Sequence, residues 1–136
     1  MKATEAADMP VLPGEDPWTS EELVRVRERL ENDIATAREE IRQVERQVAE
    51  RLTDPVEGAG DDPADTGAKA FEREHELALA YNTRDLLAAS ERAIERMHAG
   101  TYGICESCGR PTGKARLQAF PRATLCVTCK QREERR

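Results

Sequence analysis

The sequence predicts a mostly α-helical protein, in which a long antiparallel coiled-coil hairpin leads into a small C-terminal unit that carries four cysteines. Three observations predict this fold. Two long segments repeat apolar residues at helical spacing, a short acidic stretch rich in glycine and proline separates them, and all four cysteines fall near the C-terminus in two CxxC pairs. With one tryptophan, two tyrosines and two phenylalanines among 136 residues, a large conventional core is not expected.

The first 17 residues show no apolar periodicity, so we expect residues 1–17 to form a flexible N-terminal segment. They contain no apolar run of signal-peptide length, and no part of the chain approaches the ~20 apolar residues that cross a bilayer. We therefore expect a cytoplasmic protein with no membrane association.

The coiled-coil hairpin is expected to occupy residues 18–99, and its first helix has a clear start. Thr19 is the expected N-cap, Glu22 completes a capping box, and Trp18 is placed to pack onto Leu23. Apolar residues then recur at an average spacing of about 3.6, the period of an α-helix. These residues are Leu23, Val26, Leu30, Ile34, Ala37, Ile41, Val44, Val48 and Leu52.

An acidic turn is expected at residues 53–68. The first helix should end near Leu52, because Asp54 and Pro55 follow it and two glycines and a second proline come soon after. From residue 54 to residue 68 there are five acidic residues and no basic one. This segment would form the tip of the hairpin.

The second helix is expected to run to Ala99 and to be closed by Gly100. Its seam consists of Ala80, Leu87 and Ile94, with Thr83, Ser90 and Met97 between them and Leu77, Leu79 and Leu86 on the flanks. Two helices of similar length joined by a short turn should bury their seams against each other. A hairpin that satisfies its own seam is expected to be monomeric.

The cysteines indicate a zinc finger in residues 100–136, with a short C-terminal helix. Cys105 and Cys108 form one CxxC pair, and Cys126 and Cys129 form the other after 17 intervening residues. Two such turns can place four thiolates at the corners of the tetrahedron that Zn²⁺ favours, and a site with four protein ligands is structural. Gly109 directly follows the first pair, where we expect the turn to require a positive φ.

Two other readings of the cysteines remain open. Two disulfides would suit an oxidising compartment, and a redox-active CxxC would normally stand alone. His75 and His98 are interpreted as surface residues, because four cysteines already complete a zinc site. We expect Tyr102 and Phe120 to pack around the zinc ribbon and Leu117 and Leu125 to cover the sulfurs.

Charge is divided unevenly along the chain. The net charge is −6, but residues 101–136 hold eight basic and three acidic residues, whereas the remainder holds thirteen and twenty-four. A basic C-terminal unit is therefore joined to an acidic body.

Residues 100–130 contain three distinctive segments, GTYGICESCG at 100–109, RLQA at 116–119 and PRATLCVTC at 121–129. Together they resemble the zinc-finger signature of the DksA/TraR family of bacterial transcription regulators. The resemblance implies a non-enzymatic protein that binds RNA polymerase directly, inserts its coiled-coil tip into the secondary channel and modulates the stability of promoter complexes. It implies no recognition of a DNA sequence.

In the family the tip carries the motif DxxDxA; Asp62 and Asp65 match it here, and Gly67 stands in place of the alanine. Glycine in place of alanine loosens the first helical turn by up to ~1 kcal/mol. A purely structural reading is also open, in which Asp62 is an N-cap, Pro63 is the first helical residue and Asp65 faces the positive end of the helix dipole.

The resemblance also bears on the alarmone ppGpp. Family members that respond to it use basic residues on the second helix and just after the last cysteine. The corresponding helix positions here are Asn82, Asp85, Ala88 and Ala89, with Arg84 and Lys130 as nearby cations. Phosphates are bound by Arg and Lys, so we expect weak or absent potentiation by ppGpp. Thr112 stands where the family usually has isoleucine.

Two other functions are compatible with parts of the sequence. A transcript-cleavage factor of the Gre type could use two carboxylates at a coiled-coil tip to hold a second Mg²⁺. A nucleic-acid-binding zinc ribbon is suggested by a set of basic residues, namely Arg110, Lys114, Arg116, Arg122 and Lys130. We expect no catalytic residue in the chain and no cofactor other than zinc.

Overall fold

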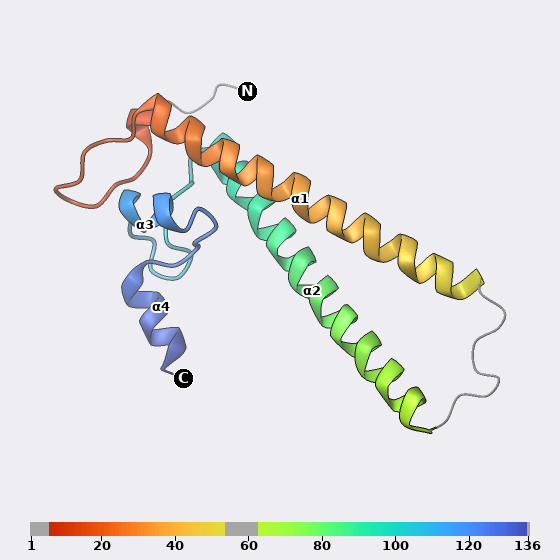
Figure 1. Ribbon diagram of the computed structural model, residues 1–136. Coiled ribbons are helices and arrows are strands. Elements are labelled where there is room, and N and C mark those ends of the chain that lie inside the picture. The colour runs from red at the N-terminus through yellow and green to blue at the C-terminus, as the bar shows by residue number, and fades with distance from the viewer. Residues whose placement is uncertain (1–5, 54–62, 136) are drawn as a thin grey trace. The chain divides into compact units, whose positions relative to one another are not determined.

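The computed structural model describes the backbone of residues 6–53 and 63–135, and their side chains except those of residues 52, 53 and 63–66. The elements in order are a 3₁₀ turn at Ala6–Asp8 (η1), α1 at Ser20–Thr53, α2 at Pro63–Ala99, α3 at Lys114–Ala119 and α4 at Val127–Glu134 (Figure 1). Within these ranges, the only β pairing is an isolated bridge between Ile104 and Pro111. The protein is thus mostly helical, as the sequence predicts.

The chain divides into two compact units. We call residues 6–33 and 89–135 the finger unit, and residues Ile34–Ala88 the hairpin unit. Both α1 and α2 contribute to each unit. Among the residues that the structure describes, no helix combines the length and the apolar character needed to span a bilayer.

The start of α1 confirms the predicted capping box. The Glu22 backbone N–H donates to Thr19 Oγ1 at 3.1 Å, and the Thr19 N–H donates to Glu22 Oε1 at 3.0 Å. Trp18 is buried, and Leu23 packs against the cluster that contains it. The helix ends at Thr53, one residue after the predicted end.

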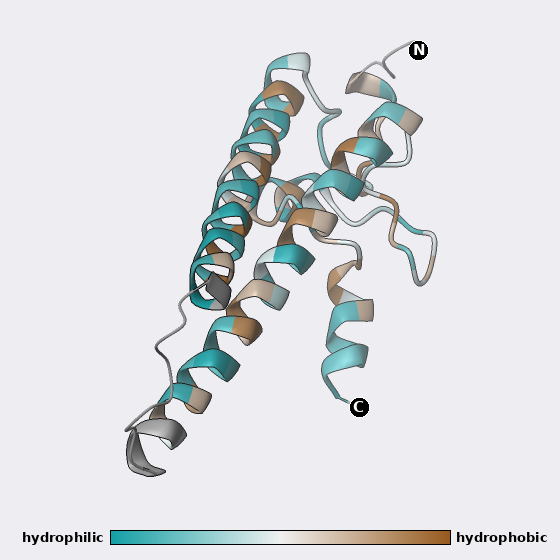
Figure 2. Ribbon diagram, turned by 90° about the vertical axis from the view of Figure 1, so that its right-hand side faces the viewer, coloured by the Kyte–Doolittle hydropathy of each residue, from teal (hydrophilic) through white to brown (hydrophobic). Residues whose placement is uncertain are grey.

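The hairpin unit contains the later part of α1 and the earlier part of α2, which run in opposite directions. Arg51 bonds Glu76, whereas Glu45, two turns earlier on α1, pairs with Arg84, two turns later on α2. Ala37 and Ala80 are buried at the seam between the helices. Their small side chains give a narrow apolar contact, and a narrow apolar seam is enough to pair long helices. Figure 2 shows hydrophobic residues recurring along both helices between hydrophilic ones.

The burial pattern of α2 confirms the predicted seam. Ala80, Ser90 and Met97 are buried, and Thr83, Leu87 and Ile94 are half-buried. The three flanking leucines, Leu77, Leu79 and Leu86, are exposed. Ala93 is also buried, which the seam pattern did not include.

The seam of the hairpin unit becomes polar toward the ends that face residues 54–62 in the sequence. On α1, Val48 continues the apolar stripe, but it is 44 % exposed. On α2, the residues at seam spacing before Ala80 are Glu76, Arg73 and Lys69. These charged residues line a cavity of about 470 Å³ together with Val48 and Leu77. The helices are tied there by Arg51, whose guanidinium donates to both oxygens of Glu76 at 2.7 and 2.6 Å.

The finger unit has its own hydrophobic core, built from segments far apart in the sequence. Trp18, Leu30, Tyr102 and Leu117 have 2 % or less of their surface exposed, and Met97 packs with them. The rings of Trp18 and Tyr102 lie 6.3 Å apart in a tilted arrangement. This core joins the start of α1, the end of α2 and α3.

The prediction of a flexible segment at residues 1–17 is wrong for its described part, which packs into the core of the finger unit. Residues 1–5 lie outside the described residues, but Ala6 and Met9 are part of the finger-unit core and Met9 is only 3 % exposed. The Pro10 carbonyl oxygen also lies next to Gly103. From residue 6 to residue 17 the segment packs as an irregular chain with one 3₁₀ turn, which explains the lack of a periodic pattern there.

Candidate metal centre

The four cysteines are brought together by a loop and a helix start. Cys105 and Cys108 lie in the loop between α2 and α3, whereas Cys126 is the N-cap of α4 and Cys129 lies inside that helix. Their Sγ atoms all lie within 4.8 Å of one another, and none of them forms a disulfide. The structure therefore brings together the four residues that the sequence predicted as metal ligands.

The first CxxC turn is held by backbone hydrogen bonds on both sides of the cysteines. The Cys105 N–H donates to Arg110 O at 2.8 Å, and the Gly109 N–H donates back to Cys105 O at 3.0 Å. Gly109 has a φ of +76°, which confirms the reason for a glycine directly after the pair. At Gly103, with a φ of +93°, an added Cβ would also meet Leu117 at 3.1 Å. Both glycines are required by the turn geometry.

The second pair is placed by α4. The Lys130 N–H donates to Cys126 O at 2.9 Å and so begins the helix that carries Cys129. The two pairs are joined through Glu106, whose N–H donates to Thr124 O at 2.9 Å. This backbone contact connects the residue after Cys105 with a residue just before Cys126.

The sulfur positions fit a tetrahedral zinc ion. Cys108 Sγ and Cys126 Sγ are 3.8 Å apart. Four sulfurs at a Zn–S distance of about 2.3 Å would be separated by about 3.8 Å along each edge of the tetrahedron. An all-thiolate donor set is also one that selects zinc over harder cations such as Mg²⁺.

The pKa values of two of these cysteines move in opposite directions. Burial raises the pKa of Cys105, but the N–H groups of Cys108, Cys126 and Ser107 outweigh it and lower the pKa to about 6. The Cys126 side chain raises the pKa of Cys129 to about 11. Thiolates this close together repel one another, and a divalent cation among them would stabilise all four as thiolates.

The aromatic and aliphatic residues around the site only partly follow the prediction. Tyr102 is buried and its hydroxyl donates to Pro121 O at 2.8 Å, and burial raises its pKa. Leu117 is fully buried and Leu125 half-buried. Phe120, however, is 62 % exposed, so the expectation that it packs around the zinc ribbon is wrong. Its ring instead contacts the Arg116 guanidinium, 5.7 Å from its centroid.

The remaining sequence predictions around the site can be placed as well. Neither His75 nor His98 joins the cluster of possible metal ligands in the described part of the chain. His75 is exposed, as expected of a surface residue, whereas His98 is half-buried. Thr112 is only 3 % exposed, and its hydroxyl has no hydrogen-bond partner among the described residues. A hydroxyl at a position where the family usually has isoleucine is thus buried without a hydrogen-bond partner in the described part of the chain.

The N-terminal segment contributes a contact that sequence reasoning missed. The six-residue helix α3 begins after Gly113, which has no side chain to cap it. The Glu15 carboxylate takes that role, because it accepts the N–H groups of Lys114 at 2.9 Å and Ala115 at 3.1 Å. Burial raises the pKa of Glu15, but these N–H groups and that of Leu12 outweigh it and hold the pKa below 4.5. Nothing local in the sequence signals a cap supplied from 99 residues away.

A second contact joins α3 to the start of α1. Lys114 Nζ lies 2.7 Å from Glu22 Oε1, and Gln118 donates to the other Glu22 oxygen at 3.0 Å. The Lys114 contact is the main reason that the pKa of Glu22 is lowered to about 2. The capping box of α1 therefore also fixes the position of α3.

The predicted tip residues are placed only in part. Asp62 lies outside the described residues. The backbone of Asp65 is helical, and α2 begins two residues earlier at Pro63, so residues 63–68 of the predicted turn belong to the helix. Gly67 is exposed, and a Cβ at this position would meet nothing within 4 Å. Gly67 is therefore not required by packing.

The positions that the family resemblance relates to ppGpp lie on α2 and α4. Asn82, Asp85 and Ala88 are exposed and Ala89 is half-buried. Arg84 pairs with Glu45 at 3.8 Å, whereas the structure gives no contact for the Lys130 side chain within the described residues. Asn82, Asp85, Ala88 and Ala89 thus provide no positive charge that could bind a phosphate.

Comparison with known proteins agrees with this fold and site. Residues 100–135 match the family described as the prokaryotic dksA/traR C4-type zinc finger. The RNA polymerase-binding transcription factor DksA of Caulobacter vibrioides is 36 % identical over 99 residues, which cover 73 % of this chain and 69 % of the relative. DksA of Escherichia coli K12 is 33 % identical over 119 residues, 87 % of this chain and 75 % of the relative.

A solved structure is similar as well. Transcription factor DksA2 from Pseudomonas aeruginosa aligns with a TM-score of 0.51 and 33 % identity, covering 83 % of this chain and 78 % of that one. A long helical hairpin and a four-cysteine cluster define this protein as a helical protein with a C4-type zinc finger, whose metal is zinc. The chain belongs to the DksA/TraR family.

The capping role of Glu15 can be tested by substitution. Glu15→Gln should lower the free energy of unfolding by about 1 kcal/mol at neutral pH, because the two N–H groups lose a charged acceptor. The pKa of Glu15 is lowered in the folded state, so its contribution is present above pH 4.5 and is lost as the pH falls through the lowered pKa. Denaturant unfolding of both proteins across this range measures the difference.

The neighbouring exposed residue provides a control. Asp16→Asn should leave the unfolding free energy nearly unchanged, since the structure gives Asp16 no contact. Equal effects of the two substitutions would show that Glu15 acts only through net charge.

Proposed function

We propose that this protein is a non-enzymatic transcription regulator that binds bacterial RNA polymerase directly. The observation that carries the proposal is the 33 % identity to a relative named as an RNA polymerase-binding transcription factor, over 87 % of this chain. That similarity spans both the hairpin and the zinc finger. Both parts would therefore serve the same partner, and the protein would act as a monomer in the cytoplasm.

Within this function, the zinc finger has a structural role. We propose that Cys105, Cys108, Cys126 and Cys129 are the four zinc ligands. Four protein ligands close the coordination sphere, so the zinc would have no open position for water or substrate. The ion would fix the loop after α2 relative to α4.

Thiol titration tests the ligand assignment. The metal-loaded protein should contain one zinc per chain and four thiols that react slowly with a thiol reagent. After a strong chelator is added, all four should react rapidly, because thiolates released from zinc are exposed to the reagent. Metal-free protein with no reactive thiols would instead indicate two disulfides and overturn the assignment.

We further propose that the tip of the hairpin enters the secondary channel of the polymerase and modulates promoter complexes. Two observations support it. The chain leaves α1 at Thr53 and enters α2 at Pro63, so Asp62 directly precedes α2 in the sequence and Asp65 lies in the first turn of that helix. Gly67 is exposed and free of packing constraints, as expected of a surface that meets a partner.

The tip proposal predicts a separation of activity from stability. Asp65→Asn should remove most of the effect on transcription while changing the melting temperature little, because the substitution keeps the shape of the side chain and removes its charge. Promoter-specific transcription assays and thermal unfolding measure the two properties. Glu74→Gln, at an exposed position of α2 with no contact given by the structure, is the matched control. Wild-type activity of the Asp65→Asn variant would contradict the tip proposal.

A weak response to ppGpp is a further part of the proposal. The α2 positions expected to hold the phosphates carry Asn82, Asp85, Ala88 and Ala89, and the adjacent Arg84 pairs with Glu45. Transcription assays with a fixed amount of protein and increasing ppGpp should therefore show little added effect. Ala89→Lys and Asp85→Lys together should increase the response, since they restore cations for phosphate. Strong potentiation of the wild type would contradict this prediction.

The structure gives a specific reason not to favour a nucleic-acid-binding ribbon. Three of the five basic residues suggested for that role have protein partners. Lys114 pairs with Glu22, Arg122 pairs with Asp33 at 3.2 Å, and Arg116 donates to Leu125 O at 3.0 Å. These cations hold the finger unit together, so they are not free to bind phosphates.

A further inference from the structure

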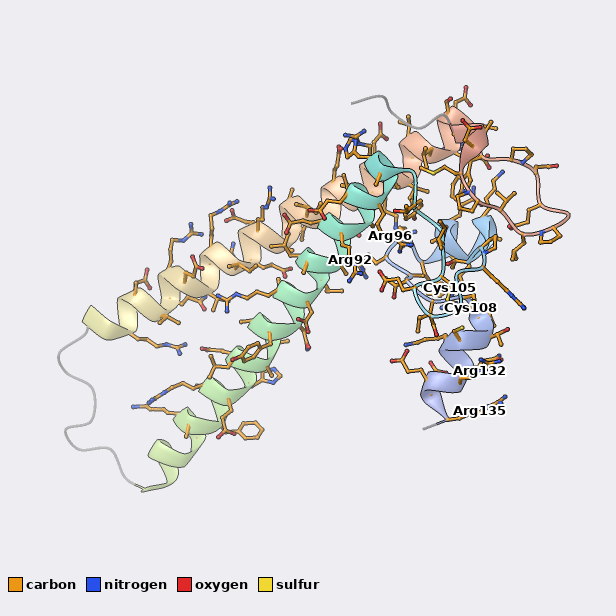
Figure 3. All side chains as sticks on the ribbon, turned by 180° about the vertical axis from the view of Figure 1, so that it is seen from behind. Arg92, Arg96, Cys105, Cys108, Arg132 and Arg135 are labelled. Atoms are coloured by element: carbon orange, nitrogen blue, oxygen red, sulfur yellow. The ribbon has the colours of Figure 1, made fainter. Side chains whose placement is uncertain are left out.

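One arginine at the end of α2 holds the backbone on both sides of a proposed zinc ligand. Arg96 lies in the last turn of α2, and its own carbonyl oxygen accepts the N–H groups of Thr101 at 2.9 Å and Tyr102 at 3.1 Å. These bonds end the helix and turn the chain toward Cys105. Figure 3 shows Arg92 and Arg96 on α2 next to the loop that carries Cys105 and Cys108.

The Arg96 guanidinium also binds the backbone of this turn. It donates to Thr101 O at 2.9 Å and to Ile104 O, the residue directly before Cys105. Another of its nitrogens lies 3.7 Å from Glu106 Oε1, on the residue directly after Cys105. A single planar group thus contacts both neighbours of this cysteine.

Arg96 is much less exposed than Arg92, the other arginine of α2 that contacts Glu106. Only 14 % of the Arg96 side chain is exposed, so its charge is held by two carbonyl oxygens and one carboxylate away from bulk water. Arg92 lies one turn earlier on the same helix and contacts the same Glu106 oxygen at 2.6 Å, but it is 61 % exposed. Surface ion pairs of that kind contribute little.

The contacts of Arg96 extend to the second cysteine pair. Glu106 donates its backbone N–H to Thr124 O, two residues before Cys126. The Arg96–Glu106 contact therefore lies on the path that joins the two halves of the site. The two cysteine pairs must be correctly spaced to form a tetrahedron. A group that holds Glu106, and with it the contact to Thr124, therefore helps to set this spacing before metal binds.

We propose that Arg96 is a positioning residue for the zinc site: its guanidinium orients Cys105 through Ile104 and Glu106, and it connects the metal centre to the end of α2. Groups that orient metal ligands commonly contribute 10- to 100-fold to metal affinity. The fork of a guanidinium is needed for this, since an ammonium cannot reach two carbonyl oxygens and a carboxylate in one plane.

The test compares three variants of the full chain. Arg96→Gln should release zinc to a colorimetric chelator about tenfold faster than the wild type. Its affinity for zinc, measured by competition, should be about tenfold weaker. Arg96→Lys should lie between that variant and the wild type, because it keeps the charge near Glu106 but loses the fork. Arg92→Gln should stay within about twofold of the wild type, since it removes only an exposed ion pair.

The Co²⁺-substituted proteins give a second measurement that loss of general stability would not reproduce. The visible bands of tetrahedral Co²⁺ report the geometry of its thiolate ligands, so Arg96→Gln should shift them while Arg92→Gln should not. If Arg96→Gln does not fold, Arg96→Lys carries the same comparison. Unchanged zinc release and unchanged bands in Arg96→Gln, or equal changes in Arg92→Gln, would overturn the proposal.

Discussion

The convergence of four cysteine sulfurs is the constraint on which the C-terminal part of this protein depends. Its helices α3 and α4 have six and eight residues, and isolated helices of this length are not stable in water. Apart from them, the finger has one isolated β bridge in the part of the chain that the structure describes. A zinc ion held by four thiolates contributes on the order of 10 kcal/mol in small units of this kind. The metal therefore replaces the large core that the composition does not provide.

Around that site, the finger unit is stabilised by contacts between distant segments. Trp18, Leu30, Tyr102 and Leu117 form an apolar core that includes both long helices. Polar contacts complete it, because Glu15 caps α3, Glu22 binds Lys114 and Gln118, and Arg96 holds the loop before the first cysteine. The metal centre is consequently an integral part of the fold rather than an appended module.

The hairpin unit follows a different physical principle. Its seam is narrow and uses alanines such as Ala37 and Ala80, so the two helices need little apolar surface to pair. Toward residues 54–62 in the sequence the seam positions are charged, and there the Arg51–Glu76 ion pair joins the helices in place of apolar packing. Apolar packing is thus strongest in the finger unit, while the segment proposed to meet the polymerase follows the most polar part of the seam.

The sequence by itself determined the features that arise from local spacing. The capping box of Thr19 and Glu22, the period of both helices and the two CxxC pairs are all short-range patterns, and each predicted its element. Only the tertiary structure decided the contacts between segments that are distant in the chain. Glu15 meets Lys114, Met9 enters the core and Phe120 points to solvent, because such pairings depend on where the folded chain brings residues together. No local pattern records that information, so a segment without periodicity looked flexible even though it packs.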